Sequence, residues 1–342
     1  ANIAVAALAR ELERHGMKAG GTFACNMYNG AELVLLSLAA AYGGYTLALL
    51  NPRLSAEERQ IRLVELENAT GECVNRLLID ATGFDAASFS TLPDDASVLT
   101  RLQAELETFA QNKLEAFDAN ASGLVIFTSG SSGTPKAAFL PWNCLMSSAA
   151  AANDVLALEG KGVWQMVLPM CHVGGFQILV RSLLNMSAFI VYERYQPKRI
   201  LNDVLSFRVT HISVVDKILA DLLEHDHDKV ITQYSCILLG GAELNKKTIK
   251  AALRAKAKVY ASYGMTETAS LIAAAPVTRN FDGGLEVLPG YDVRIMRPDE
   301  DGIGQLHVAG PGIFEGYLNA RKASSADGYF VTGDRASVDR YG

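Results

Sequence analysis

The chain has 342 residues, of which 49% are hydrophobic and 20% are charged. This composition excludes a disordered or collagen-like protein and allows one large core or several sub-domains. Its 31 basic and 37 acidic residues give a net charge of −6, and no basic block argues for a nucleic-acid partner. The five cysteines are scattered and form no CxxC pair, which is typical of a reduced, cytoplasmic protein.

The N-terminal part shows neither a signal peptide nor a convincing membrane span. The first residues lack a basic region and a cleavage site, so we expect no secretory signal. The stretch from Leu33 to Pro52 carries no charge, but Gly43 and Gly44 divide it. It therefore predicts a buried helix, a turn and a buried strand.

Short apolar runs alternate with amphipathic segments along the middle of the chain. Runs of this kind, without polar alternation, indicate strands buried on both faces; they are Leu124–Phe127, Val163–Leu168, Ala188–Tyr192, Ile212–Val215 and Ile237–Leu239. Apolar residues at helical spacing fill 197–207 and 218–223. The alternation predicts an α/β fold with layered sheets flanked by helices.

A loop rich in hydroxyl groups follows the first of these runs. The segment Thr128-Ser-Gly-Ser-Ser-Gly-Thr-Pro-Lys136 offers two glycines, five hydroxyls and one lysine, which is suitable chemistry for holding phosphate. The spacing differs from a Walker A loop. A flexible Ser/Gly turn is the alternative for such a loop taken alone.

Two further segments follow predicted strands. His172, in Pro169-Met-Cys-His172, could border a pocket or donate a proton, or simply be a hydrogen-bonded histidine. Gly240-Gly-Ala242 could let a ligand lie against bare backbone, or form a plain strand-to-helix turn. The pattern His225-Asp-His-Asp228 contains ligand-type residues, but its charged surroundings favour a solvated loop over a metal site.

The last part of the chain combines polar motifs with strand-like runs. Tyr263-Gly-Met-Thr-Glu267 offers an aromatic ring, a hydroxyl and a carboxylate, which could stack a base, touch a phosphate and hold Mg²⁺. From about residue 277 to 342 we expect a small β sub-domain, after an α/β core of residues 1–276 that comprises two sub-domains. Strands are predicted at 291–296, 305–308, 329–331 and 336–338, with the turn Thr332-Gly-Asp334 between the last two.

The order and spacing of these motifs resemble the adenylate-forming (AMP-forming) acyl-CoA ligase superfamily. The segments 172–182, 238–242 and 263–270 look most like the o-succinylbenzoate–CoA ligases of menaquinone biosynthesis. The resemblance implies the fold of the large N-terminal domain, with a small β-barrel-like sub-domain, and a C-terminal lid domain absent from this chain. It also implies two steps. A carboxylate reacts with ATP, with Mg²⁺ bound, to give an acyl-adenylate and pyrophosphate, and CoA then captures the acyl group.

The resemblance also assigns roles to residues that match the motifs. Catalytic roles are implied for Lys136, His172, Thr266 and Glu267, with Glu267 as the metal ligand. Residues bordering the acid are His172, Arg181, Gly240 and Gly264; Arg181 would meet a second carboxylate, whereas a structural or surface arginine is the alternative. The implied nucleotide-binding set is Thr128, Ser129, Gly130, Ser131, Ser132, Gly133, Thr134, Lys136, Gly241, Ala242, Tyr263, Thr266 and Asp334.

The sequence departs from the family pattern at Ala137, where the family usually has glycine, and only loosely matches it over 280–289. Because the lid domain is absent, we expect this chain to bind nucleotide but to catalyse weakly or not at all. The alternatives are another aryl- or acyl-CoA ligase, a carrier-loading adenylation domain, or a non-catalytic nucleotide-binding module. Homodimerisation is an expectation of the family alone.

Overall fold

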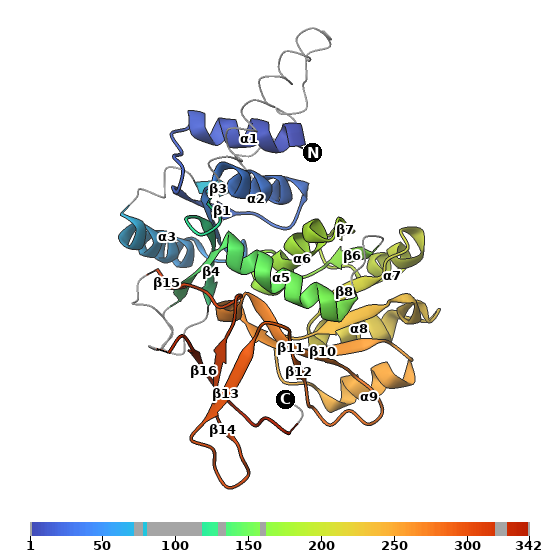
Figure 1. Ribbon diagram of the computed structural model, residues 1–342. Helices are drawn as coiled ribbons and strands as arrows, with labels where there is room; N and C mark the ends of the chain where they lie inside the picture. The colour runs from blue at the N-terminus through green and yellow to red at the C-terminus, as the bar shows by residue number, and fades with distance from the viewer. Residues whose placement is uncertain are drawn as a thin grey trace. The chain divides into compact units, whose positions relative to one another are not determined.

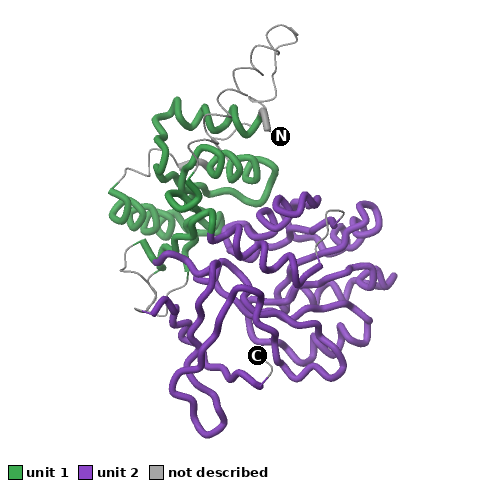
Figure 2. The backbone as a smooth tube through the Cα atoms, in the orientation of Figure 1, with its two compact units in different colours: residues 1–143, 317–321 green, residues 144–316, 322–342 purple. Residues whose placement is uncertain are grey.

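The structure is a computed structural model that describes residues 2–71, 78–80, 118–128, 135–157, 162–318 and 327–340. The chain forms two compact units, shown in Figure 2: unit 1 comprises residues 1–143 with 317–321, and unit 2 comprises residues 144–316 with 322–342. The predicted α/β class is confirmed, because largely parallel sheets combine with helices. The predicted sub-domain boundary after residue 276 stays a prediction.

In its described residues, unit 1 contains a six-stranded sheet of order β15-β5-β4-β2-β1-β3. β1, β2, β3 and β4 pair in parallel, and β4 forms an antiparallel pair with β5. The strands are β1 Thr22–Asn26, β2 Thr46–Leu49, β3 Leu78–Asp80, β4 Gly123–Thr128, β5 Lys136–Pro141 and β15 Gly316–Tyr317. Before β4, the described residues form the helices α1 Asn2–Arg14, α2 Ala31–Gly43 and α3 Ala56–Thr70.

The uncharged stretch from Leu33 to Pro52 forms the predicted helix, turn and strand. α2 ends at Gly43, and Gly44 adopts a φ of 68°, a left-handed conformation that suits glycine. Every residue of β2 is buried, as expected for a strand covered on both faces. No helix in the described ranges is long and apolar enough to cross a membrane.

In the part of the chain that the structure describes, unit 2 contains a seven-stranded sheet of order β12-β11-β10-β9-β8-β6-β7. Strands β7, β6, β8, β9 and β10 pair in parallel, whereas β11 and β12 add antiparallel strands at one edge. The strands are β6 Val163–Met166, β7 Ala188–Val191, β8 His211–Val214, β9 Cys236–Leu239, β10 Val259–Met265, β11 Ser270–Pro276 and β12 Glu286–Val287.

Successive side chains along these strands point to opposite faces of the sheet, and different helices pack against each face. Ile212 and Ile237 belong to an apolar cluster with residues of α7 Pro197–Ser206, α8 Asp216–His225 and α9 Lys246–Arg254; Figure 1 shows α8 and α9 side by side. The neighbouring residue His211 points to the other side, where its Nε2 lies 3.0 Å from the carbonyl of Leu156 in α5 Trp142–Leu156. α6 Val173–Leu184 contacts β6, β7, β8 and β11.

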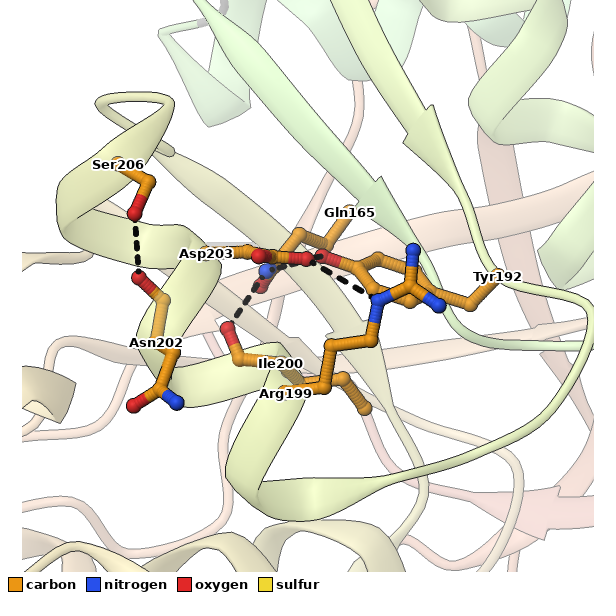
Figure 3. Close-up of polar contacts among 7 residues, drawn as sticks. All are labelled: Gln165, Tyr192, Arg199, Ile200, Asn202, Asp203 and Ser206. Atoms are coloured by element: carbon orange, nitrogen blue, oxygen red, sulfur yellow. Dashed lines mark hydrogen bonds and ion pairs between the residues drawn. The ribbon is translucent and has the colours of Figure 1, made fainter.

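A buried glutamine of the sheet, Gln165, is hydrogen-bonded to α7, as Figure 3 shows. Nε2 of Gln165 in β6 donates to the hydroxyl of Tyr192 and to the carbonyl of Ile200, each at 2.8 Å. The Tyr192 hydroxyl donates in turn to Asp203 at 2.8 Å, and Tyr234 donates to Oε1 of Gln165 at 2.5 Å. The amide thus has partners on both its nitrogen and its oxygen, which offsets the cost of burying it.

The β-rich part after residue 276 contains an antiparallel sheet of β13 Asp292–Met296, β14 Gly304–Ala309 and β16 Phe330–Ala336. The prediction of two strands separated by a turn at 332–334 is wrong, because β16 runs through that segment. Gly333, with a φ of 85°, and a register shift opposite it in β14 absorb the irregularity as a bulge. The strand predicted at 336–338 is also wrong beyond Ala336.

Candidate functional site

Two predicted site residues that are far apart in sequence form a direct hydrogen bond. The hydroxyl of Tyr263 in β10 donates to Oδ2 of Asp334 in β16 at 2.7 Å. Burial, together with this bond, raises the pKa of Tyr263, so the phenol stays protonated at neutral pH. The backbone N–H of Asp334 donates to the Thr332 hydroxyl at 3.1 Å, and Asp334 itself is exposed. The pair presents an aromatic ring beside a carboxylate.

The motif that begins at Tyr263 continues into a tight turn. Thr266–Thr268 form the 3-10 helix η4, and the carbonyl of Glu267 accepts a 2.9 Å hydrogen bond from the N–H of Phe314. Two non-glycine residues with positive φ follow, Ala269 at 50° and Ser270 at 108°. Such conformations are costly for L-amino acids and need surrounding structure to hold them.

Gly264, a predicted acid-binding residue, lies at a close approach of the β10 and β11 backbones. A Cβ at this position would come within 2.0 Å of the carbonyl oxygen of Ser270, and the pairing register shifts between Tyr263 and Gly264. The close approach of two backbones therefore requires glycine here, whether or not a ligand is present.

Gly240, Gly241 and Ala242 follow the carboxyl end of β9, as predicted. Gly241 and Ala242 are exposed, and Gly241 has a φ of 89°. A Cβ on Gly240 would lie 2.6 Å from the hydroxyl oxygen of Ser262 in the neighbouring strand. Bare backbone at the carboxyl end of a parallel strand is a common place for ligands in α/β folds.

The predicted acid-site residues near the two ends of α6, His172 and Arg181, have different surroundings. His172 is the N-cap residue of the helix, with an exposed side chain and no capping hydrogen bond from it. The surrounding protein nevertheless lowers its pKa by desolvation, so the ring is neutral at pH 7. Arg181 lies nine residues on, about 13.5 Å along the helix axis, near the C-terminal end.

Arg181 is fully buried, which excludes the alternative of a surface arginine. Its Nη2 donates to the Ser270 hydroxyl at 3.0 Å, and its guanidinium lies 5.7 Å from the centre of the Trp164 ring. Among the described residues, Nε and Nη1 have no hydrogen-bond partner. Burial lowers the pKa of Arg181 to about 10, so the side chain is still cationic at neutral pH. The two unpartnered donors of this buried cation suit an anion, but both lie beneath the surface, so neighbouring side chains would have to move for a ligand to reach them.

In unit 1, the two ends of the hydroxyl-rich loop are paired. Thr128 at the end of β4 faces Lys136 at the start of β5 in the antiparallel register. The Lys136 ammonium lies 5.1 Å from the centre of the Tyr317 ring. The predicted phosphate ligands between them lie outside the described residues; they are Ser129, Gly130, Ser131, Ser132, Gly133 and Thr134.

The acidic and histidine-rich segment after α8 has local structural roles. The Asp226 carboxylate accepts hydrogen bonds from the backbone N–H groups of Val230, at 2.7 Å, and Ile231, at 3.1 Å. His225 Nδ1 lies 2.8 Å from the carbonyl oxygen of Asp221. The two Asp226 bonds hold the start of the 3-10 helix η3 Val230–Gln233, and the His225 contact lies within α8.

Two buried polar residues outside the predicted set, Gln177 and Ser148, contact the turn after Glu267. Gln177 and Ser148 both donate to the carbonyl of Ala269. A signal was available, because Gln177 and Arg181 are polar residues four positions apart in a mainly apolar helix, in which Ser182 is also polar. Residues at this spacing lie on one helix face.

Comparison with known proteins identifies the class of protein. The model of the family described as AMP-binding enzyme matches residues 1–318, and the chain therefore belongs to this family. A 2-succinylbenzoate–CoA ligase of Bacillus cytotoxicus is 31% identical over 342 residues, covering 95% of this chain and 67% of the ligase. A ligase of the same name from Staphylococcus epidermidis is 29% identical over 324 residues, and the match spans 92% of this chain and 64% of that protein's length.

Solved structures agree with these sequence matches. The o-succinylbenzoate coenzyme A synthetase of Bacillus subtilis in complex with AMP superposes with a TM-score of 0.79 at 26% identity, covering 99% of this chain and 88% of that chain. The same synthetase in complex with ATP and a magnesium ion gives a TM-score of 0.79 at 25% identity, covering 99% of this chain and 71% of that one.

Proposed function

We propose that this chain is the nucleotide- and acid-binding part of an AMP-forming carboxylate–CoA ligase, with o-succinylbenzoate as its acid. In the first step a carboxylate oxygen attacks the α-phosphorus of ATP, and the bond to the β-phosphate breaks to release pyrophosphate. In the second step the CoA sulfur attacks the acyl carbon and AMP leaves. The family and the relatives named above support this reaction.

The observation that carries the proposal is the hydrogen bond between Tyr263 and Asp334. It supports a nucleoside site in which the tyrosine ring stacks beside adenine and the carboxylate accepts from the ribose hydroxyls. Gly241 and Ala242 leave exposed backbone that can border the base. We assign Thr266 to the α-phosphate.

Glu267 is a suitable single protein ligand for Mg²⁺. The described residues contain no group of three or more histidine, cysteine or acidic side chains that could hold a metal ion. Mg²⁺ fits such a site, because it commonly takes one or two carboxylates and completes its octahedron with phosphate oxygens and water. The bound ion would neutralise charge on the phosphates as pyrophosphate leaves.

The loop in unit 1 is proposed to hold the β- and γ-phosphates. Thr128 and Lys136 stand at its two ends, and the hydroxyl groups of the segment between them would donate to phosphate oxygens. Lys136 would add a positive charge where negative charge develops.

Arg181 supports an acid with a second anionic group. o-Succinylbenzoate keeps its aromatic carboxylate when its succinyl carboxylate is activated, and the two free donors of this buried cation would pair with that anion. His172, Gly240 and Gly264 are proposed to border the acyl chain.

A calorimetric titration with two stable acyl-sulfamoyl adenosines tests the assignment. One compound carries the o-succinylbenzoyl group and the other a medium-chain fatty acyl group. We expect the aryl compound to bind at least tenfold tighter, which is about 1.4 kcal/mol. Arg181→Met should abolish this preference, whereas Arg199→Met, which removes an exposed arginine of α7, should keep it.

The possible results test the acid, the nucleotide site and the catalytic activity separately. Equal binding of the two compounds would refute o-succinylbenzoate and favour another acyl-CoA ligase or a carrier-loading adenylation domain. Binding of neither would refute the nucleotide site itself. Tight binding without pyrophosphate exchange would favour the non-catalytic module.

The location, partners and co-substrate of the whole protein are part of the same proposal. We propose a cytoplasmic protein that acts on small molecules without a nucleic-acid partner, in agreement with its net charge of −6. CoA is the proposed co-substrate, and homodimerisation and a C-terminal lid domain are expected from the family.

A further inference from the structure

Two buried side chains from different helices donate to one carbonyl oxygen, that of Ala269. Nε2 of Gln177 in α6 reaches it at 2.7 Å, and Oγ of Ser148 in α5 reaches it at 2.9 Å. Gln177 also donates to the carbonyl of Leu145 at 3.1 Å. Because both partners of Gln177 are carbonyl oxygens, only the NH₂ group of the amide can face them.

The contacted residue is part of the strained turn after Glu267. Ala269 and Ser270 have φ values of 50° and 108°. A third side chain, that of Thr268, bonds the backbone on both sides of this turn. The Thr268 hydroxyl accepts from the N–H of Met265 at 3.0 Å and lies 2.6 Å from the carbonyl of Ser270. We call Ser148, Gln177 and Thr268 the turn clamp.

The members of the turn clamp have no exposed surface. A glutamine at a fully buried helix position costs free energy that leucine or methionine would avoid, since its amide must be removed from water. Strain and buried polar groups concentrate where a fold must fix a functional backbone geometry. Thr268 directly follows Glu267, and Ala269, whose carbonyl Ser148 and Gln177 contact, lies two residues after it.

We propose that the turn clamp positions Thr266 and Glu267 for Mg²⁺-bound ATP. Gln177 and Ser148 act as positioning residues: they fix the Ala269 carbonyl, and the left-handed turn then fixes the direction of the Glu267 and Thr266 side chains. This inference rests on the proposed function, because it specifies which buried residues hold the phosphate and metal ligands of that site.

The test compares two buried glutamines of unit 2. Gln177→Met removes the donor to the Ala269 carbonyl with little change in volume. Gln165→Met, a change of the same size, removes the donor to the Ile200 carbonyl in the network of Figure 3. Both variants should unfold at a lower temperature than the unmodified chain, because the buried carbonyl groups that each glutamine contacts lose a donor, which costs more than the desolvation of the amide that methionine avoids. Only Gln177→Met should bind MgATP about tenfold more weakly, or about 1.4 kcal/mol, measured by calorimetry at a temperature where each variant is folded.

Hydrogen exchange provides a readout that does not depend on nucleotide. Without ligand, Gln177→Met should speed amide exchange over residues 265–271, and Gln165→Met should leave this segment protected. Unchanged exchange and an affinity within twofold of the unmodified chain would overturn the proposal. An equal loss of affinity in Gln165→Met would also overturn it, because the effect would then be general destabilisation.

A second pair of variants covers the case in which Gln177→Met does not fold. Thr268→Val removes the hydroxyl at nearly constant volume, and Thr268→Ser keeps it. We expect Thr268→Val to weaken MgATP binding about tenfold and Thr268→Ser to restore binding to within about threefold. Equal affinities would overturn the proposal. If the unmodified chain itself binds no MgATP, the proposed function fails, and the exchange data alone then decide whether the clamp orders the turn.

Discussion

Buried His211 should make the stability of the chain depend on pH. Its Nε2 lies 3.0 Å from the Leu156 carbonyl, and its ring centre lies 5.1 Å from that of Trp164. Burial lowers the pKa of His211 below its ordinary value of 6.5. The unfolded chain therefore binds a proton more readily, and the free energy of unfolding falls as pH drops below about 6.5. Above that pH the imidazole is neutral in both states and contributes no pH dependence.

Urea unfolding at about pH 7.5 and about pH 5.5 measures this effect. The unmodified chain should lose stability between the two values. His211→Gln keeps a donor for the Leu156 carbonyl but does not titrate, so it should lose less stability, although His172 contributes a change of the same sign. His227→Gln, at an exposed position, should behave like the unmodified chain. If His211→Gln loses as much stability between the two pH values as the unmodified chain, His211 is not the source of this pH dependence.

At the scale of elements, two adjacent glycines at the start of α6 should respond oppositely to alanine. A Cβ on Gly175 would come within 2.2 Å of the Pro169 carbonyl oxygen, whereas a Cβ on Gly174 would meet only Leu168 Cδ1 at 3.7 Å. Gly175→Ala should therefore lower the free energy of unfolding by about 2–3 kcal/mol through overpacking. Gly174→Ala should be neutral or raise it by up to about 1 kcal/mol, because alanine favours the helix.

Thermal and urea unfolding of the two variants give the comparison directly. Each exchange adds one methyl group to the same turn of the same helix, so differences in the unfolded state largely cancel. Equal stabilities would mean that α6 can shift away from Pro169 without cost, and that its N-terminus is not fixed against the preceding loop.

Much of the fold could be predicted because strand and helix patterns are local. The short apolar runs at 163–168 and 237–239 correspond to β6 and β9, and the stripe at 197–207 corresponds to α7. The strand through Thr332–Asp334 was missed, because Gly333 has a left-handed conformation and the bulge depends on the partner strand. Local sequence carries no information about such a partner.

The candidate site divides in the same way. Tyr263 and Asp334 were each recognised from their motifs, but their hydrogen bond joins residues 71 positions apart and needs the fold. Gln177 was missed because its partner, Ala269, lies 92 positions away. A polar residue in a mainly apolar helix can be recognised from the local sequence. The backbone group that it contacts cannot, because that group lies in a distant part of the chain.

At the scale of the whole molecule, nucleotide and metal should stabilise the fold by mass action. A ligand at 100 times its dissociation constant raises the free energy of unfolding by about 2.7 kcal/mol, provided that it does not bind the unfolded chain. We therefore expect MgATP to raise the unfolding temperature of the chain, and EDTA to remove the part of this gain that depends on the metal.

Glu267→Gln separates the metal from the nucleotide. The amide keeps the size of the side chain but loses the charge that attracts Mg²⁺, so the variant should keep the stabilisation by metal-free ATP and lose the increment that Mg²⁺ adds. Glu286→Gln, an exposed change in β12, should keep both. If Glu267→Gln still gains the full increment, Glu267 is not the metal ligand, and Mg²⁺ is then held by the phosphates and other groups of the chain.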